Sequence, residues 1–409
     1  MNPDIAIIGG GPAGLVLAIS LARRGIPSIV FEAMDDPTRL EKFNPSRSYA
    51  IDITGHGLKA IRHIDAVDDF DRTLIPFNGM KLNGRVVDTW DEPGWIASRG
   101  DIVTVLTELA LRDYADFIDI RFQCRLDKID IHHGEFDIRQ AEQDIEHCGP
   151  FDLVVAADGG GSKVREQAEQ QDRNYQLTRE DTAYYFKMLA MDQNTEDLDS
   201  NYLEVLSKAT IMAAGAINGP GGKEDPLWFC AVAYRNDQRY PSVEAVKVDL
   251  AKRAPGVLKY CSDNALEAFS NLPAQNIGRI TSASQLYGGR VAFLGDAAIS
   301  YPPIGQGING AMESAMVLDK VLAEHVKGET WSASSVQAAL ATYSDAWLPE
   351  TRAVSWFGKK INQANRWHVI RAMLLEALRI PVLHNAKSST LPYSEAQRRA
   401  KWLGPLWFG

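Results

Sequence analysis

An α/β fold is predicted, with a Rossmann-type domain, an antiparallel sheet inserted into it, and helices at the C-terminal end. Three features of the 409-residue sequence indicate this fold. An apolar strand, a glycine turn and a helix open the chain, a strand-rich stretch covers residues 182–235, and helical patterns dominate from residue 310 onward. Strands that alternate with helices favour a parallel sheet, whereas consecutive strands favour an antiparallel one.

The start of the chain contains a complete βαβ unit. Asp4–Ile8 is a short apolar run typical of a buried strand, and Pro12–Arg24 has a helical pattern that Gly25 ends. Ser28–Glu32 follows as the second strand. Two strands joined by a crossover helix over so short a length predict a parallel pair, which is how a Rossmann-type sheet begins.

Later segments extend both parts of the fold. Lys128–Arg139 alternates apolar and polar residues around a turn and predicts a β-hairpin, while Phe151–Ala157 and Arg290–Leu294 predict buried strands. Val243–Phe269 has helical signals. We therefore expect a first domain built from residues 1–72, 99–174 and 286–330, an inserted sheet built from residues 73–98 and 175–285, and a C-terminal helical region over residues 331–409.

Composition narrows the classes of function. The net charge is −10 and the isoelectric point about 5.4, which argues against nucleic-acid binding. The four cysteines form no CxxC pair, so neither a metal site nor a redox pair is indicated. We expect no signal peptide and no transmembrane segment, and scattered thiols suit a reducing, cytoplasmic compartment.

The strongest motif is Gly9-Gly10-Gly11-Pro12-Ala13-Gly14, which follows the first strand and opens the first helix. In a GxGxxG turn the first glycine allows the tight bend, the second lets a pyrophosphate approach the backbone, and the third lets helix and strand pack closely. Glu32, eighteen residues after Gly14, is placed to accept from ribose hydroxyls. The residues expected to bind a dinucleotide are Gly9, Gly11, Pro12, Ala13, Gly14 and Glu32.

A second glycine cluster distinguishes between the possible dinucleotides. Gly295-Asp296-Ala297-Ala298 follows a predicted strand and precedes Gly305-Gln306-Gly307-Ile308-Asn309-Gly310. A third segment, Asp152–Arg165, contains Asp158-Gly159 after another predicted strand. Together these motifs resemble those of the class A flavoprotein monooxygenases, the family of p-hydroxybenzoate hydroxylase, kynurenine 3-monooxygenase and the tetracycline-inactivating monooxygenases.

The resemblance implies that the dinucleotide is FAD and that its site includes several further residues. Asp296 would contact the ribityl chain or its phosphate, and the helix after the second cluster would point its N-terminus at the flavin, where it stabilises negative charge. The further positions that match cofactor-binding positions of the family are Arg47, Arg99, Asp158, Asp296, Gly305, Gly307, Ile308 and Asn309. Candidates for the flavin side of the substrate pocket are Asp52, Pro302 and Pro303.

The sequence departs from the family at two positions. Members usually carry a histidine after the GDAA motif, whereas this chain has Ile299. Kynurenine hydroxylases place an arginine near the segment aligned with residues 78–81, to hold the substrate carboxylate, and Met80 occupies that position here. The second departure argues against kynurenine as the substrate.

The function that the resemblance implies is hydroxylation of an aromatic or polycyclic small molecule. NADH or NADPH would reduce FAD, and O₂ would then form a flavin C4a-hydroperoxide that transfers one oxygen atom. The alternatives are a flavin-dependent halogenase or reductase on the same fold, or an FAD-binding protein without catalysis. No WxWxIP motif of the tryptophan halogenases is present. The sequence identifies no catalytic base and leaves open the oligomeric state and the choice between NADH and NADPH.

The substrate pocket is expected on the inserted sheet. Its strands carry large apolar and aromatic residues, and alternation along a strand points every second residue to one face. We expect at least two of this group to face the flavin: Tyr184, Tyr185, Phe186, Met188, Trp228 and Phe229. A mostly apolar pocket would suit a flat aromatic substrate and exclude water.

Overall fold

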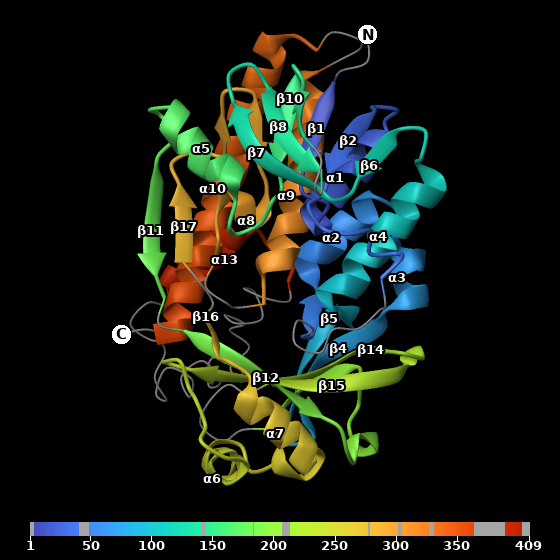
Figure 1. The fold of residues 1–409 in the computed structure, drawn as a ribbon, viewed down its shortest axis with the longest axis vertical. Coiled ribbons are helices and arrows are strands. Elements are labelled where there is room, and N and C mark those ends of the chain that lie inside the picture. The colour runs from blue at the N-terminus through green and yellow to red at the C-terminus, as the bar shows by residue number, and fades with distance from the viewer. Residues whose placement is uncertain are drawn as a thin grey trace.

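The computed structural model describes residues 4–40, 49–140, 144–182, 184–206, 213–276, 279–301, 305–326, 331–363 and 389–402. Arg47, Pro302 and Pro303 lie outside the described residues. Figure 1 shows a parallel sheet with its helices in the upper half, a second large sheet across the lower half, and C-terminal helices along one side.

The upper sheet is the predicted Rossmann-type sheet. Its six strands have the order β18-β19-β10-β1-β2-β6, and neighbours are parallel except for β18 and β19. The strands are β1 (Ile5–Ile8), β2 (Ser28–Phe31), β6 (Ile118–Arg121), β10 (Leu153–Ala156), β18 (Tyr287–Gly288) and β19 (Val291–Phe293). Both faces of the central strands β1, β10 and β19 are covered, so these three are short runs of buried apolar residues, whereas the edge strand β6 carries Asp119 and Arg121.

Helices pack against this sheet and connect it to the rest of the chain. They are α1 (Pro12–Ala22), α2 (Gly55–His63), α3 (Val67–Thr73), α4 (Arg99–Asp113), α5 (Lys163–Gln171), α8 (Gly295–Ala298) and α9 (Gly307–His325). Every residue of α1 is buried, and Pro12 occupies its first turn, where no backbone N–H is needed. The predicted hairpin is part of a three-stranded sheet of β7 (Cys124–Asp130), β8 (Glu135–Gln140) and β9 (Ile145–Cys148).

The lower sheet has eight strands in the order β16-β12-β15-β14-β13-β4-β5-β3. They are β3 (Ile51–Ile53), β4 (Ile75–Leu82), β5 (Arg85–Ala97), β12 (Tyr185–Met191), β13 (Tyr202–Val205), β14 (Ala213–Gly219), β15 (Gly222–Tyr234) and β16 (Gln275–Asn276). The sheet is antiparallel as predicted, except that β13 and β4 run parallel. A separate ribbon pairs β11 (Leu177–Asp181) with β17 (Arg279–Ala283).

The two faces of the lower sheet differ in what covers them. The outer face packs against α6 (Val243–Arg253) and α7 (Asp263–Asn271), which lie below the sheet in Figure 1. The predicted helical segment is thus two helices, separated at Ala254-Pro255-Gly256, because proline cannot continue a helix. Two one-turn 3₁₀ segments, Thr195–Asp197 and Leu258–Tyr260, also lie in this part of the chain. The inner face is turned toward the Rossmann-type domain.

The C-terminal helices described are α10 (Ala333–Gln363) and α13 (Tyr393–Trp402), which pack against each other and against the upper domain. In the described part of the chain, no helix is long and apolar enough to cross a bilayer.

Lys187 on β12 is a buried cation on the outer face of the large sheet. Its side chain is 1% exposed, and its Nζ has no hydrogen-bond partner among the described residues. The ring centroids of Tyr240 and Phe269 lie 5.0 and 4.6 Å from it. Burial lowers the pKa of Lys187, because the charged form has lost its water.

We expect Lys187→Met to raise the free energy of unfolding by about 1 kcal/mol at neutral pH, since methionine fills a similar volume without a buried charge. Because the folded pKa is lowered, the wild type gains stability as pH rises through that pKa toward about 10.4, the unfolded value. The advantage of the variant should therefore shrink at alkaline pH. Urea unfolding of both proteins at neutral and alkaline pH measures this. A variant with a lower free energy of unfolding would show that the contacts of the charged Nζ with the two rings stabilise the protein more than burial of the charge destabilises it.

Candidate active site

The first glycine loop joins the end of β1 to the start of α1. Gly9 has φ +112°, and a Cβ there would lie 2.4 Å from the carbonyl oxygen of Ala157. A Cβ on Gly14 would lie 2.0 Å from the carbonyl oxygen of Gly9. On Gly11 the nearest atom is Nη2 of Arg99, at 3.5 Å. The first and third glycines are thus required by packing, while the second faces open space beside a guanidinium.

Glu32 is held against the same loop. Its Oε2 accepts from the backbone N–H of Gly10 at 2.6 Å, and its Oε1 accepts from the N–H of Met34 at 2.8 Å. A carboxylate has about four acceptor positions, so capacity remains for hydroxyl donors. The side chain is therefore oriented before any ligand binds, at the place where a ribose would follow a pyrophosphate held at Gly11.

Arg99 and Asp296 supply opposite charges on two sides of the loop. Arg99 opens α4, whose first turn is fixed by a capping box between Ser98 and Asp101. Burial raises the pKa of Asp296, while the positive charges of Arg99 and Arg165 oppose that shift. Asp296 is nevertheless exposed to solvent, and we call the space that it faces, beside Gly11, Arg99 and Gly307, the recess. Neither Arg99 nor Asp296 makes an ion pair with any residue that the structure describes.

The second glycine cluster reaches the same recess. Gly295 has φ +51° and begins α8, and a Cβ there would lie 2.6 Å from Cβ of Ala311 on α9. A Cβ on Gly307 would lie 4.0 Å from Oδ1 of Asp296. The N-terminus of α9 therefore lies beside Asp296, as the motif order predicts. Ile299, which replaces the usual histidine, is 1% exposed and packs in the hydrophobic core.

Asn309 is fully buried, and its side chain is engaged with protein. Its Oδ1 accepts from the N–H of Thr54 at 3.1 Å, and its Nδ2 donates to the carbonyl oxygens of Asp52 at 2.9 Å and Gly305 at 3.2 Å. The amide thus holds the end of β3 and the loop before α9 together. Any contact between Asn309 and a cofactor would have to come from its backbone. Oδ2 of Asp52 is buried without a described partner.

Arg165 joins the glycine loop at residues 159–161 to the backbone of Asp296 and Ala297. Matching the motifs residue by residue does not reveal this role. Arg165 as a whole residue is 2% exposed. Its Nη1 donates to the carbonyl oxygens of Asp296 at 2.8 Å and Ala297 at 3.2 Å, and its Nη2 donates to that of Gly160 at 2.6 Å. The glycine loop begins six residues upstream, so the only sequence signal for Arg165 was its place in the Asp158 motif.

Asp158 is oriented by the start of α5. Its Oδ2 accepts from the N–H groups of Lys163 at 2.9 Å and Val164 at 3.4 Å, and burial raises its pKa. Its Oδ1 is buried without a partner among the described residues. Beside it, a Cβ at each of three consecutive glycines, residues 159–161, would meet nothing within 4 Å. An unsatisfied acceptor next to an open glycine loop fits a ligand with hydroxyl or N–H donors.

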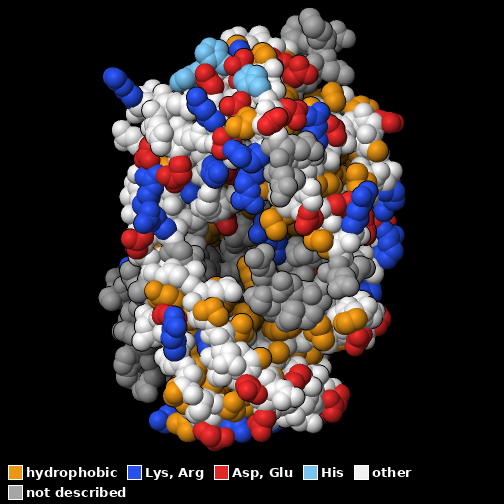
Figure 2. Space-filling view, in the orientation of Figure 1, with side chains coloured by type: hydrophobic (Ala, Val, Ile, Leu, Met, Phe, Trp, Pro, Cys, Tyr) orange, Lys and Arg blue, Asp and Glu red, His pale blue; other side chains and the backbone are white. Residues whose placement is uncertain are grey.

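The inner face of the large sheet is apolar near this recess. Phe186, Met188 and Phe229 point to that face, and Phe229 and Met188 form a cluster with Ile217. The ring centroids of Tyr49 and Phe186 lie 6.2 Å apart. The charges of Arg99 and Asp296 also act electrostatically on the Tyr49 hydroxyl. Tyr49 therefore connects the apolar face to the glycine loops. Figure 2 shows the molecule hollowed between the upper domain and the lower sheet.

The predicted group of aromatic residues is thus divided between two faces. Tyr185 and Trp228 pack in the outer cluster with α6 and α7. Met80, at the position aligned with the carboxylate-binding arginine, also packs against that outer cluster, and Lys81 pairs with Asp199 at 2.9 Å.

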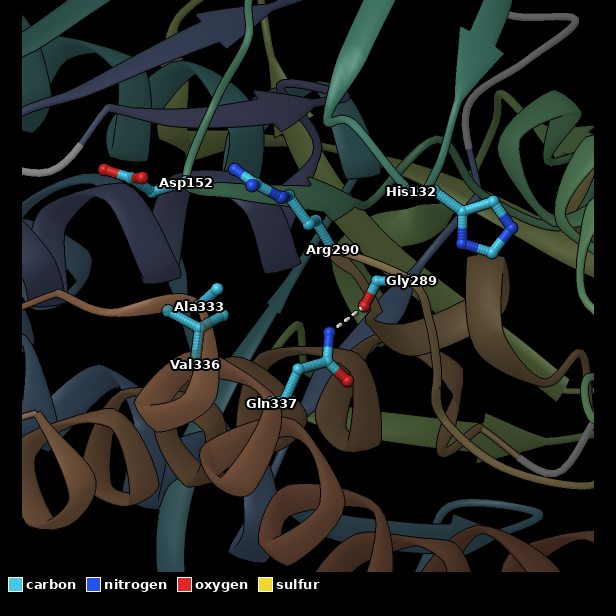
Figure 3. Close-up of a pocket in the computed structure, with 7 residues that line it drawn as sticks. All are labelled: His132, Asp152, Gly289, Arg290, Ala333, Val336 and Gln337. Atoms are coloured by element: carbon cyan, nitrogen blue, oxygen red, sulfur yellow. Dashed lines mark hydrogen bonds between the residues drawn. The ribbon is translucent and has the colours of Figure 1, made fainter.

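A separate cavity of about 360 Å³ lies at the other end of the upper sheet. Figure 3 shows its lining residues, His132, Asp152, Gly289, Arg290, Ala333, Val336 and Gln337. Asp152 and Arg290 precede β10 and β19, so this cavity is at the amino ends of the strands. Ligands of doubly wound folds bind at the carboxyl ends, where the glycine loops are, so this cavity is distinct from the candidate site.

The residues at the carboxyl ends fit FAD. Gly11 and residues 159–161 leave room for a ligand against the backbone, Arg99 offers a positive charge without an ion-pair partner among the described residues, and Asp158 has an unsatisfied oxygen. Glu32 suits an adenosine with free ribose hydroxyls. The N-termini of α1 and α9 both open toward the recess, where their dipoles favour negative groups.

Comparison with known proteins supports FAD as the cofactor of this site. A family model described as FAD binding domain matches residues 2–52 and 112–356. Kynurenine 3-monooxygenase of Cryptococcus neoformans var. neoformans serotype D (strain B-3501A) is 24% identical over 404 residues, which cover 90% of this chain and 79% of the relative. The enzyme of the same name from Salinispora tropica is 25% identical and covers 97% of this chain and 90% of the relative.

A solved structure supports the same fold. The tetrameric form of 2-methyl-3-hydroxypyridine-5-carboxylic acid oxygenase has a TM-score of 0.66 and 21% identity, covering 97% of this chain and 96% of its own. The chain belongs to the FAD-binding family, and within it to the class A flavoprotein monooxygenases. It is an FAD-binding monooxygenase, and therefore an oxidoreductase.

Proposed function

We propose that the protein hydroxylates a flat aromatic small molecule, with NADH or NADPH as reductant and O₂ as oxidant. The observation that carries this proposal is the apolar inner face of Phe186, Met188 and Phe229, connected through Tyr49 to the charged recess of Arg99 and Asp296. When bound, FAD would pass two electrons from the nicotinamide to O₂, so that one oxygen atom enters the substrate and the other leaves as water.

The chain's own groups have three tasks in this reaction. The backbone at Gly11 and the Arg99 guanidinium would bind the pyrophosphate, and Glu32 would accept from the ribose. Asp296 would accept from a ribityl hydroxyl, and the N-terminus of α9 would favour negative charge on the flavin ring. The apolar sheet face would hold the substrate ring and keep water away from the reacting atoms.

The substrate class follows from what this face contains. Phe186 and Phe229 offer rings against which an aromatic substrate can pack, with the offset or edge-to-face geometries that aromatic pairs prefer. Met80 packs against the outer cluster and so lies away from the inner face, where the substrate would bind. We therefore favour a flat aromatic compound because of the rings of Phe186 and Phe229 on the inner face.

A screen of aromatic compounds for stimulated NAD(P)H oxidation tests the proposal. The expected result is a substrate that accelerates NAD(P)H consumption and yields a product carrying one atom from isotopically labelled O₂. Stimulated oxidation that yields only hydrogen peroxide with every compound, or reduction of a substrate without oxygen incorporation, would contradict hydroxylation. A protein that binds FAD but does not oxidise NADH or NADPH would be the non-catalytic alternative.

Two adjacent residues of β15 provide a matched pair of variants. Phe229 points to the inner face and Trp228 to the outer face, and they are 5% and 3% exposed. We expect Phe229→Leu to raise KM for the aromatic substrate about 5- to 20-fold, as the loss of a ring contact of about 1 kcal/mol or more implies, and also to lower Tm, because the side chain is buried. Trp228→Leu should lower Tm and leave KM unchanged. If the two variants changed KM equally, the inner face would not be part of the substrate site.

A further inference from the structure

The hydroxyl of Tyr393 connects the C-terminal helix α13 to the loop that precedes α9. Tyr393 is fully buried, and its OH donates to Oε1 of Gln306 at 2.8 Å. Burial raises the pKa of Tyr393 well above its usual range, so the hydroxyl stays protonated and remains a donor. The two residues are 87 positions apart, and Gln306 is also fully buried.

Gln306 stands at the point where the loop becomes a helix. It is the N-cap residue of α9, and its carbonyl oxygen accepts from the N–H of Gly310 at 2.9 Å. Its Nε2 donates to the carbonyl oxygen of Gly305 at 3.2 Å. The position of this side chain therefore sets where the loop at Gly305–Gly307 lies, and with it the first unpaired N–H groups of α9.

The ring of Tyr393 is fixed independently of its hydroxyl. It stacks on His56, with ring centroids 3.6 Å apart and an interplanar angle of 15°. Nδ1 of His56 hydrogen-bonds Glu313 of α9, whose other oxygen accepts from Lys59 at 2.9 Å. Removing only the hydroxyl would thus leave the ring in place.

The start of α13 is tied to α10 by a different set of bonds. The N–H of Ser394 donates to Oε2 of Glu350 at 3.0 Å, and its hydroxyl donates to the other carboxylate oxygen. The docking of α13 and its contact with Gln306 can therefore be altered separately by mutation.

We propose that Tyr393 is a positioning residue through which α13 sets the loop at Gly305–Gly307, and so the affinity and the reduction potential of the bound flavin. Tyr393 itself acts through Gln306. The N-terminus of α9 favours negative charge, and a reduced flavin carries more of it than an oxidised one. A displaced loop would thus weaken binding of reduced FAD more than that of oxidised FAD, which makes the potential more negative. The inference rests on the flavin site and not on the proposed substrate.

The test is Tyr393→Phe, assayed by titrating apoprotein with FAD and by measuring the flavin reduction potential and absorption spectrum without substrate. We expect the FAD dissociation constant to rise about 2- to 10-fold, the effect of one neutral hydrogen bond, with a more negative potential. Combining this change with Gln306→Met should add nothing beyond Gln306→Met alone, because both remove the same bond.

Two variants serve as controls. Tyr343→Phe removes a hydroxyl of equal burial, which donates to the carbonyl oxygen of Phe293 at 3.0 Å. Ser394→Ala weakens the attachment of α13 but keeps Tyr393 and Gln306. Both should lower Tm with an unchanged potential. The proposal is overturned if Tyr393→Phe lowers Tm without altering affinity or potential, or if Tyr343→Phe shifts the potential equally. Failure to find a hydroxylated product would leave these flavin measurements intact.

Discussion

Gly11→Ala is expected to fold normally and to retain no FAD after gel filtration. The backbone of Gly11 has φ −77°, which alanine adopts without strain, and the nearest atom to an added Cβ is Nη2 of Arg99 at 3.5 Å. The methyl group would occupy the surface that a pyrophosphate has to approach. We expect the FAD dissociation constant to rise more than about 100-fold, since both the helix N-terminus and Arg99 would lose their contacts.

Gly14→Ala is the matched control for this change. A Cβ there would lie 2.0 Å from the carbonyl oxygen of Gly9, inside the contact between β1 and α1. The expected result is loss of stability by about 1–3 kcal/mol or more, visible as a lower Tm of the apoprotein. If Gly11→Ala keeps its yellow colour and bound FAD, the glycine loop is not where the cofactor's phosphates lie.

Asp296→Asn should weaken FAD binding about 10- to 100-fold, because a hydrogen bond to a charged acceptor contributes roughly 1.5–3 kcal/mol. Asp296→Ala should weaken it at least as much and still fold. Fluorescence titration of the apoprotein measures both. If both variants bound FAD with unchanged affinity, Asp296 would not be part of the FAD site.

The sequence by itself determined the fold class and the identity of the cofactor. Short apolar runs, a glycine turn and helical spacing are local patterns, and each needs only neighbouring residues to be recognised. The Gly9–Gly14 turn and the Gly295–Asn309 cluster could be matched to a family because their backbone requirements permit few other residues. The alternation in β12 and β15 also predicted that aromatic side chains would be divided between two faces, although it did not show which face is turned toward the glycine loops.

Only the tertiary structure decided how these segments meet. Arg165 bonds the backbone at Asp296, 131 residues away, and Tyr393 reaches Gln306 across 87 residues. The side-chain amide of Asn309 accepts from the N–H of Thr54, 255 residues away, and the motif position of Asn309 did not indicate this bond. Such partners leave no periodic signal, because a hydrogen bond between distant residues depends on where whole elements pack and not on the spacing of residues along the chain.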